Sequence, residues 1–187
     1  AAGVVSIYLT GRDLDRFPIR SGQYVNVRFL TGGWWRAHPY SISAQPNGRW
    51  LRMTVKALGD DSARARDLAV GTVAIVEGPY GNLTSDRRTA DQVVLMGAGI
   101  GVTPLRALLE EFSAGLPVTL LYRARRPVDL VFRRELDLLA ERRGARVLYL
   151  VGSRHEGDID TAIRPDLIRR LAPAIALQHS AGRHAGN

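Results

Sequence analysis

Cysteine is absent from this chain of 187 residues. Its absence excludes disulfide bonds, thiol catalysis and iron–sulfur clusters with cysteine ligands. Long apolar stretches are absent as well, because no run approaches the roughly 18 residues that a membrane-spanning helix needs. We therefore expect no direct membrane span. The hydrophobic content of 45 % is that of an ordinary globular protein.

Lysine is almost absent. Lys56 is the only lysine among 26 basic residues, so arginine supplies nearly all of the positive charge behind the formal net charge of +8. Such a charge can indicate nucleic-acid binding. The arginines are scattered, however, and no platform of interleaved aromatic and basic residues is present. A basic nucleotide pocket, or a face toward anionic lipid, explains the charge as well, so we expect no nucleic-acid partner.

The usual patterns of metal sites and hydrolases are also missing. His155, His179 and His184 have no metal-ligand spacing with any partner residue. No Ser-His-Asp order and no paired-carboxylate motif stands out. We assign no metal site and no hydrolytic function.

A glycine-rich turn is the most informative feature that is present. Gly97, Gly99 and Gly101 follow the apolar run Val93–Met96 and precede a helical pattern. A strand, a glycine turn and a helix start commonly hold a phosphorylated cofactor, because the backbone can approach phosphate oxygens closely. We expect Thr103 to cap the helix and Pro104 to occupy its first position. The same glycines could serve packing alone.

The turn departs from the common dinucleotide-binding fingerprint G-x-G-x-x-G. Val102 stands where that fingerprint requires its third glycine. A standard Rossmann start is therefore excluded, although a phosphate-binding turn is not.

The first half of the chain is predicted to be an antiparallel barrel, because short β-rich segments alternate with turns. The expected strands are Val4–Leu9, Tyr24–Phe29, Tyr40–Ser43, Leu51–Val55 and Val73–Glu77. One short helix is expected over Asp61–Leu68, and a tight turn over Glu77–Gly81.

The second half alternates strands with helices, which is typical of parallel βαβ units. The expected strands are Val93–Met96, Val118–Arg123 and Arg146–Val151, and the expected helices are Pro104–Ala114, Leu130–Arg143 and Asp166–Leu171. The fold class is thus mixed β and α/β, with a barrel over residues 1–88 and an incomplete parallel α/β domain over 89–187. The polar segment from about residue 178 lacks apolar periodicity and is expected to be disordered.

Three motifs upstream of the glycine turn carry a family resemblance. They read His38-Pro39-Tyr40-Ser41-Ile42-Ser43, Val55-Lys56-Ala57-Leu58-Gly59-Asp60-Asp61-Ser62 and Glu77-Gly78-Pro79-Tyr80-Gly81. Together with the turn, this order resembles the ferredoxin–NADP reductase superfamily. The His-Pro-Tyr-Ser form is most similar to its ferric reductase and NADPH oxidase branch. The resemblance implies an FAD-binding barrel followed by an NAD(P)-binding domain.

The resemblance implies a flavin site on the first two motifs. In the family, the residue at Tyr40 stacks on the isoalloxazine, and Ser41 reaches its reactive nitrogen as the catalytic hydroxyl. His38 stands where most members have arginine, and Pro39 follows it.

Lys56, flanked by Val55 and Ala57, would meet the flavin diphosphate with Gly59 and Ser62. A plain helix cap, formed by Asp61 or Ser62, is the alternative, and for Ser62 alone it fits equally well.

The resemblance also implies a nicotinamide site. The three glycines would cradle the pyrophosphate, with Thr103 and Pro104 at the helix start. Ser153 and Arg154 resemble the pair that grips the adenosine 2′-phosphate in members that prefer NADPH, and Arg123 could assist them. Solvated loop arginines are the alternative for both positions. We expect NADPH as the coenzyme, and NADH less so.

The function implied is a flavin reductase that passes a hydride from NADPH to FAD. Electrons would then reach haem in a transmembrane partner, an iron–sulfur protein or ferric iron. The expected location is cytoplasmic, at the inner face of a membrane. Compared with the family, an early barrel strand, the late nucleotide-domain strands and a Cys-Gly-Pro segment are missing. A truncated, non-catalytic flavin- or nucleotide-binding fragment is therefore the alternative.

Coenzyme choice gives the first testable prediction. Arg154→Ala should remove a charge-assisted contact to the 2′-phosphate, which is worth roughly 1.5–3 kcal/mol. The dissociation constant should rise for NADPH and stay unchanged for NADH. Equal losses for the two coenzymes would show that Arg154 shapes its loop and does not read the phosphate.

Overall fold

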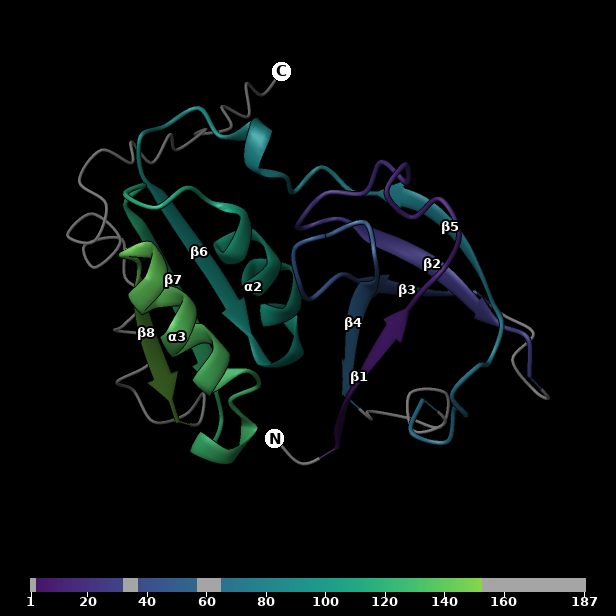
Figure 1. Ribbon diagram of the computed structural model, residues 1–187. Helices are drawn as coiled ribbons and strands as arrows, with labels where there is room; N and C mark the ends of the chain where they lie inside the picture. Colours follow the sequence, from purple (N-terminus) through teal and green to yellow (C-terminus); the bar gives the residue numbers. More distant parts are fainter. Residues whose placement is uncertain (1–2, 32–36, 57–64, 153–187) are drawn as a thin grey trace, which may run out of the picture.

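The computed structural model describes residues 3–31, 37–56 and 65–152 (Figure 1). Its first part is built from antiparallel strands, and its second part from a parallel sheet with helices. The predicted fold class is thereby confirmed. Two predicted helices are affected by these limits. Asp166–Leu171 lies outside the described residues, and the described end of Asp61–Leu68 is turn.

The antiparallel part consists of two small sheets. One pairs β1 (Val4–Leu9) with β4 (Leu51–Lys56), and the other has the order β3-β2-β5. The strands of that second sheet are β2 (Tyr24–Phe29), β3 (His38–Ser41) and β5 (Ala74–Tyr80).

Alternation of apolar and polar residues directs one face of β2 inward. Val25, Val27 and Phe29 are buried and meet Ile42 and Met53 in the core of this part. The intervening residues of β2 are only partly buried. This pattern is what a half-buried antiparallel strand requires.

The segment Glu77–Gly81 was predicted as a tight turn, and this prediction is wrong. Strand β5 continues through it to Tyr80. Tyr24 pairs with Tyr80 and Asn26 with Glu77, so β5 carries one more residue than β2 over this interval. This is a β-bulge, which tolerates glycine because the backbone is locally irregular, and Gly78 accordingly has φ 138°.

The parallel part is a three-stranded sheet with the order β6-β7-β8. Its strands are β6 (Val93–Ala98), β7 (Val118–Ala124) and β8 (Arg146–Val151). The central strand β7 is buried almost throughout, as the middle strand of a parallel sheet must be when helices cover it. Its Leu120 and Tyr122 join the core of this part.

Two helices complete the parallel part. Helix α2 (Val102–Glu111) lies between the two parts of the chain, and α3 (Arg133–Arg143) packs near α2 and β8 (Figure 1). Helix α3 begins three residues later than predicted, and Pro127–Asp129 forms a separate 3₁₀ turn, η3, before it. Gly144 ends α3 with φ 67°, a left-handed backbone that glycine adopts readily.

Phe132 precedes α3 with a left-handed backbone, at φ 61°. This conformation is uncommon for a residue with a side chain.

Among the described residues, no helix is both long and apolar enough to cross a membrane.

Candidate functional site

The glycine-rich turn joins β6 to α2 through a short 3₁₀ turn, η2 (Gly99–Gly101). Its glycines serve two different purposes. A Cβ at Gly97 would come within 2.7 Å of Leu105 Cδ1, so Gly97 allows helix α2 to pack closely on the strand. A Cβ at Gly99 or Gly101 would meet nothing within 4 Å. The open side of the turn is therefore at Gly99 and Gly101, where an anionic group can approach the backbone.

The start of α2 differs from the prediction. Gly101 occupies the N-cap position, so Thr103 and Pro104 lie inside the first turn of the helix. The prediction that Thr103 caps the helix is wrong, because the Thr103 hydroxyl donates to the Ile100 carbonyl at 3.0 Å. Proline is still tolerated there, since the first helical N–H groups lack partners within the helix. Those N–H groups and the helix dipole favour an anion at this end.

A buried tyrosine of the parallel sheet holds the glycine turn by a hydrogen bond. Tyr122 lies on the central strand β7 and is fully buried. Its hydroxyl donates to the Gly99 carbonyl at 3.0 Å and accepts from the Val131 N–H at 2.9 Å. Burial raises the pKa of Tyr122 above its ordinary value, so the group stays a neutral hydroxyl that can donate and accept. Sequence reasoning missed this residue, which reads as one apolar position in a buried strand.

Strand β4 also meets the parallel part. Strand β4 lies against the η2 turn. Lys56, at its last position, pairs with Asp129 of η3, with Nζ and Oδ1 3.7 Å apart. Asp129 also accepts two hydrogen bonds from Arg126, at 3.0 and 3.2 Å. These hydrogen bonds, followed by the nearby positive charges, lower the pKa of Asp129. The cation predicted to meet a flavin phosphate thus already has a carboxylate neighbour.

The predicted flavin-stacking strand β3 presents its residues on both sides. In the antiparallel register Val25 faces Tyr40 and Tyr24 faces Ser41. Tyr40 is half-buried and packs against the core of the antiparallel part, with its ring 6.4 Å from that of Phe29. His38 is half-buried and Pro39 is exposed.

An exposed aromatic pair lies next to Ser41. Tyr24 and Tyr80 have ring centroids 5.5 Å apart and are 36 % and 41 % exposed. Because Tyr24 precedes the buried Val25 on β2 and is paired with Tyr80, the two tyrosines lie on the face of the sheet opposite the core. Sequence reasoning missed it, since the two tyrosines are far apart in the chain and are joined only by strand pairing.

Other predicted residues are placed less fully. Val55 is buried at the end of β4, and Arg123 is half-buried near the end of β7. Five predicted cofactor-binding residues lie outside the described residues: Ala57, Gly59, Ser62, Ser153 and Arg154.

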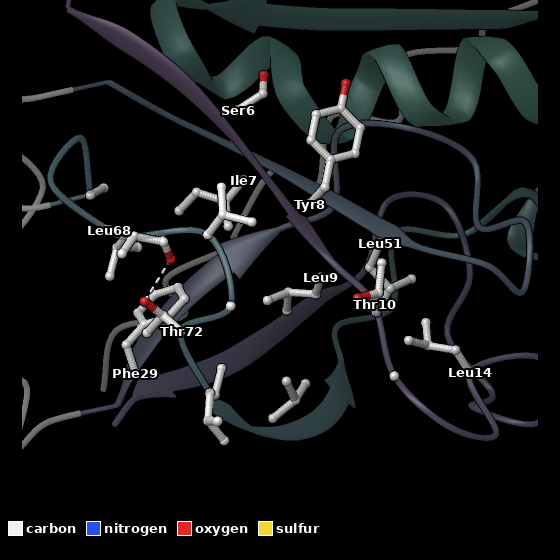
Figure 2. Close-up of a pocket in the computed structure, with 18 of the residues that line it drawn as sticks. Ser6, Ile7, Tyr8, Leu9, Thr10, Leu14, Phe29, Leu51, Leu68 and Thr72 are labelled. Atoms are coloured by element: carbon white, nitrogen blue, oxygen red, sulfur yellow. Dashed lines mark hydrogen bonds between the residues drawn. The ribbon is translucent and has the colours of Figure 1, made fainter. Parts of the chain in front are cut away.

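A cavity of about 870 Å³ opens beside β1 in the antiparallel part, as Figure 2 shows. Its wall is mostly apolar and includes Ile7, Leu9, Phe29 and Leu68. The cavity does not include any of the predicted cofactor-binding residues that the structure describes. Within residues 3–31, 37–56 and 65–152, no group of three or more histidines and carboxylates is arranged to hold a metal ion.

Comparison with known proteins agrees with this geometry. Residues 4–84 match the model of a family described as an FAD-binding domain. The chain is 31 % identical over 133 residues to the glycine betaine monooxygenase reductase subunit of Chromohalobacter salexigens, which covers 67 % of this chain and 36 % of that protein. It is 33 % identical over 136 residues to a flavohemoprotein of Chromobacterium violaceum, covering 65 % and 34 %. The chain thus spans about a third of the length of these relatives.

Solved structures share the fold. The FAD/NAD-binding domain of nitric oxide dioxygenase from Vibrio cholerae superposes with a TM-score of 0.67 at 24 % identity, covering 88 % of this chain and 77 % of that one. The ferredoxin-NADP+ reductase of Plasmodium falciparum gives 0.66 at 17 % identity, covering 89 % and 70 %.

The fold and the family match define an FAD-binding module of oxidoreductase type. In this chain, an antiparallel part lies beside a glycine turn on a parallel sheet. Residues 4–84 thus belong to a family of FAD-binding domains, and the chain has the fold of the compared ferredoxin-NADP+ reductase. Its relatives include both oxygenase reductases and a respiratory burst oxidase homolog of Oryza sativa, at 28 % identity over 51 % of this chain and 14 % of that protein.

The support of the glycine turn by Tyr122 can be tested directly. Tyr122→Phe should leave the Gly99 carbonyl and the Val131 N–H without this partner, and the free energy of unfolding should fall by about 1–3 kcal/mol. Urea unfolding measures the loss, and hydrogen exchange should quicken at residue 131. Tyr149→Phe is the matched control, because the Tyr149 hydroxyl bonds Asp137 at the surface. Equal losses in both variants would contradict a special role for Tyr122.

Proposed function

We propose that this chain is a flavin reductase module that accepts a hydride from NADPH on bound FAD and passes electrons on singly. The observation that carries the proposal is the contact of β4 with the η2 turn. Strand β4 ends at Lys56, which is expected to meet the flavin diphosphate, and η2 is expected to hold the nicotinamide pyrophosphate, so the two expected cofactor sites lie on contacting elements. We propose residues 1–88 as the FAD-binding domain and residues 89–187 as the NAD(P)-binding domain.

On the flavin side, the proposed work of the chain is binding and orientation. The Ser41 hydroxyl can donate or accept near the reactive edge of the flavin ring. Tyr40, with His38 and Pro39 before it, would border the ring. Lys56, with Val55 and Ala57 beside it and Gly59 and Ser62 following, would meet the diphosphate. FAD itself supplies the hydride acceptor and the ability to release electrons one at a time.

On the nicotinamide side, the turn is well suited to a pyrophosphate. Gly99 and Gly101 leave open space where side chains would stand, and the first N–H groups of α2 follow them. Gly97 keeps the helix close to the strand. We propose Ser153 and Arg154, with Arg123, as the group that reads the 2′-phosphate.

NADPH is favoured over NADH on two grounds. The Ser153-Arg154 pair suits a 2′-phosphate, because arginine can bind phosphate through two parallel hydrogen bonds. A relative from Mycobacterium tuberculosis is described as an NADPH oxidoreductase, at 27 % identity over 77 % of this chain and 40 % of that protein.

The electron acceptor is proposed by chemical class. Haem in a membrane partner, an iron–sulfur protein and ferric iron are all one-electron acceptors that a reduced flavin can serve. The names of the relatives support this range, since one is a flavohemoprotein and another the reductase subunit of a monooxygenase. A cytoplasmic location at the inner face of a membrane belongs to the haem version of the proposal.

A visible spectrum followed by an anaerobic NADPH titration tests the function. The purified chain, reconstituted with FAD, should show the flavin absorption bands, and NADPH should bleach them with about one equivalent per flavin. Bound flavin that NADPH does not bleach would overturn the reductase and favour a non-catalytic binding fragment. Absence of bound flavin after reconstitution would overturn both.

The stacking wall for the flavin gives a further prediction. Tyr40→Ala should weaken FAD binding by about 1–3 kcal/mol if the tyrosine stacks on the ring. Tyr8→Ala is the control, because Tyr8 is 55 % exposed and packs on Trp50. Fluorescence titration gives the FAD dissociation constant, and a melting curve reports any loss of folding from the half-buried position of Tyr40. A loss in Tyr24→Ala with none in Tyr40→Ala would transfer the wall to the exposed Tyr24–Tyr80 pair.

A further inference from the structure

Two buried arginines and one glutamate join the antiparallel part to the parallel part. Arg52 lies on β4, Arg106 on α2 and Glu135 on α3. The side chains of Arg52 and Arg106 are each only 8 % exposed. Glu135 Oε2 accepts from Arg52 Nη1 at 3.0 Å and from Arg106 Nε at 2.9 Å. We refer to these three residues as the Arg52–Arg106–Glu135 cluster.

Both arginines also bind the same backbone carbonyl. The Ser43 carbonyl accepts from Arg52 Nη2 at 2.6 Å and from Arg106 Nη1 at 3.2 Å. Ser43 is fully buried, and its hydroxyl accepts from Arg52 Nε at 3.1 Å. Ser43 lies two residues after Ser41, so the cluster is attached directly to the end of the proposed flavin strand.

The other side of the cluster is attached to the glycine turn. Arg106 lies in the second turn of α2, the helix that begins immediately after Gly101. Its Nη1 also pairs with Glu110 Oε2 at 2.5 Å, and that same oxygen accepts from the Gln45 N–H at 2.7 Å. Helix α2 is thus bound to the antiparallel part at two successive turns on one face.

The chemistry of the cluster favours one fixed arrangement. Hydrogen bonds between guanidinium and carboxylate groups are strong and directional, because the donors form a rigid fork. The Glu135 side chain is 39 % exposed, but removing its carboxylate would take an ionic partner from two buried guanidinium groups, which is costly. A shift of one part against the other would break several of these bonds together. In some proteins, buried ionic groups specify a unique geometry while adding little net stability.

We propose that the Arg52–Arg106–Glu135 cluster is a positioning device that fixes the orientation of the flavin strand relative to the glycine turn. It connects Ser43, next to Ser41, with the helix that starts at the nucleotide site. Its effect on catalysis rests on the proposed function, because hydride transfer requires the two cofactors to meet in one narrow geometry. The effect of the cluster on the geometry of the apoprotein does not depend on the proposed function.

The absence of cysteine in the chain makes a direct measurement of orientation possible. Arg49→Cys, on the loop before β4, and Arg146→Cys, at the start of β8, are both exposed positions for paired spin labels. Pulsed electron paramagnetic resonance then gives the distribution of distances between the two parts. Glu135→Gln removes the shared negative charge, and Arg106→Lys keeps the positive charge but removes the fork. Glu141→Gln, at an exposed position on the same helix as Glu135, is the matched control.

The expected result is a broader distance distribution in Glu135→Gln and in Arg106→Lys, with a distribution like that of the parent protein in Glu141→Gln. In stopped-flow measurements, the rate of flavin reduction by NADPH should fall about tenfold or more in the two cluster variants. The dissociation constants for FAD and NADP+ should change by no more than about a factor of two, because neither binding site loses a contact.

Two outcomes would overturn the proposal. An unchanged distance distribution in both cluster variants would show that other contacts set the orientation. A broadened distribution with an unchanged rate of flavin reduction would show that the orientation does not limit the reaction. A parent protein that does not oxidise NADPH would refute the proposed function alone, and the distance distributions would still decide whether the cluster fixes the geometry.

Discussion

Helix α2 packs into two hydrophobic cores at once, and the arrangement of the whole chain depends on this. Ala107 is fully buried among the residues of the antiparallel core, whereas Leu105, Leu108 and Leu109 belong to the core of the parallel part. On the antiparallel side, Glu111 accepts from the Ser21 N–H at 3.2 Å and from the Ser85 hydroxyl. A helix that is apolar on one face and carries alanine and ionic groups on the other can bridge two sheets without leaving a void. Because the same helix starts at the glycine turn, the position of that turn relative to the antiparallel sheets follows from packing.

The regular elements were predictable from the sequence wherever a local pattern produces them. Strands β1, β2 and β8 have the predicted bounds, because β-rich segments are bounded there by turn residues. The bounds differ where local signals compete with long-range pairing. Pro104 suggested a helix start, but η2 extends the helical backbone back to Gly99. Glu77–Gly81 has the composition of a turn, but pairing with β2 keeps it extended.

In the candidate site, too, local motifs were predictable from the sequence and long-range contacts were not. Motifs local in sequence, such as the glycine turn and the end of β4, could be located from the residues alone. The contacts that organise them could not, because their partners are distant in the chain. Arg52 and Glu135 are separated by 83 positions, and Arg106 and Ser43 by 63. Tyr122 reaches Gly99 across 23 positions. Neither arginine belongs to a recognisable motif, and an arginine in a strand or a helix is usually solvated, so only the fold reveals that these two are buried.

At Phe132, the left-handed backbone costs stability, whereas the contacts of the aromatic ring contribute to it. Replacing this residue, which has φ 61°, with glycine would relieve the backbone, because glycine adopts the left-handed conformation without steric cost. Here the Arg52 guanidinium lies over the Phe132 ring, with Arg52 Cζ 4.8 Å from the ring centroid. The ring also packs against the core of the parallel part. Glycine would relieve the backbone but remove a cation–π contact worth about 0.5–2 kcal/mol. Replacement of Phe132 by glycine would therefore lower the backbone strain at residue 132, but it would remove the aromatic ring that contacts the buried Arg52.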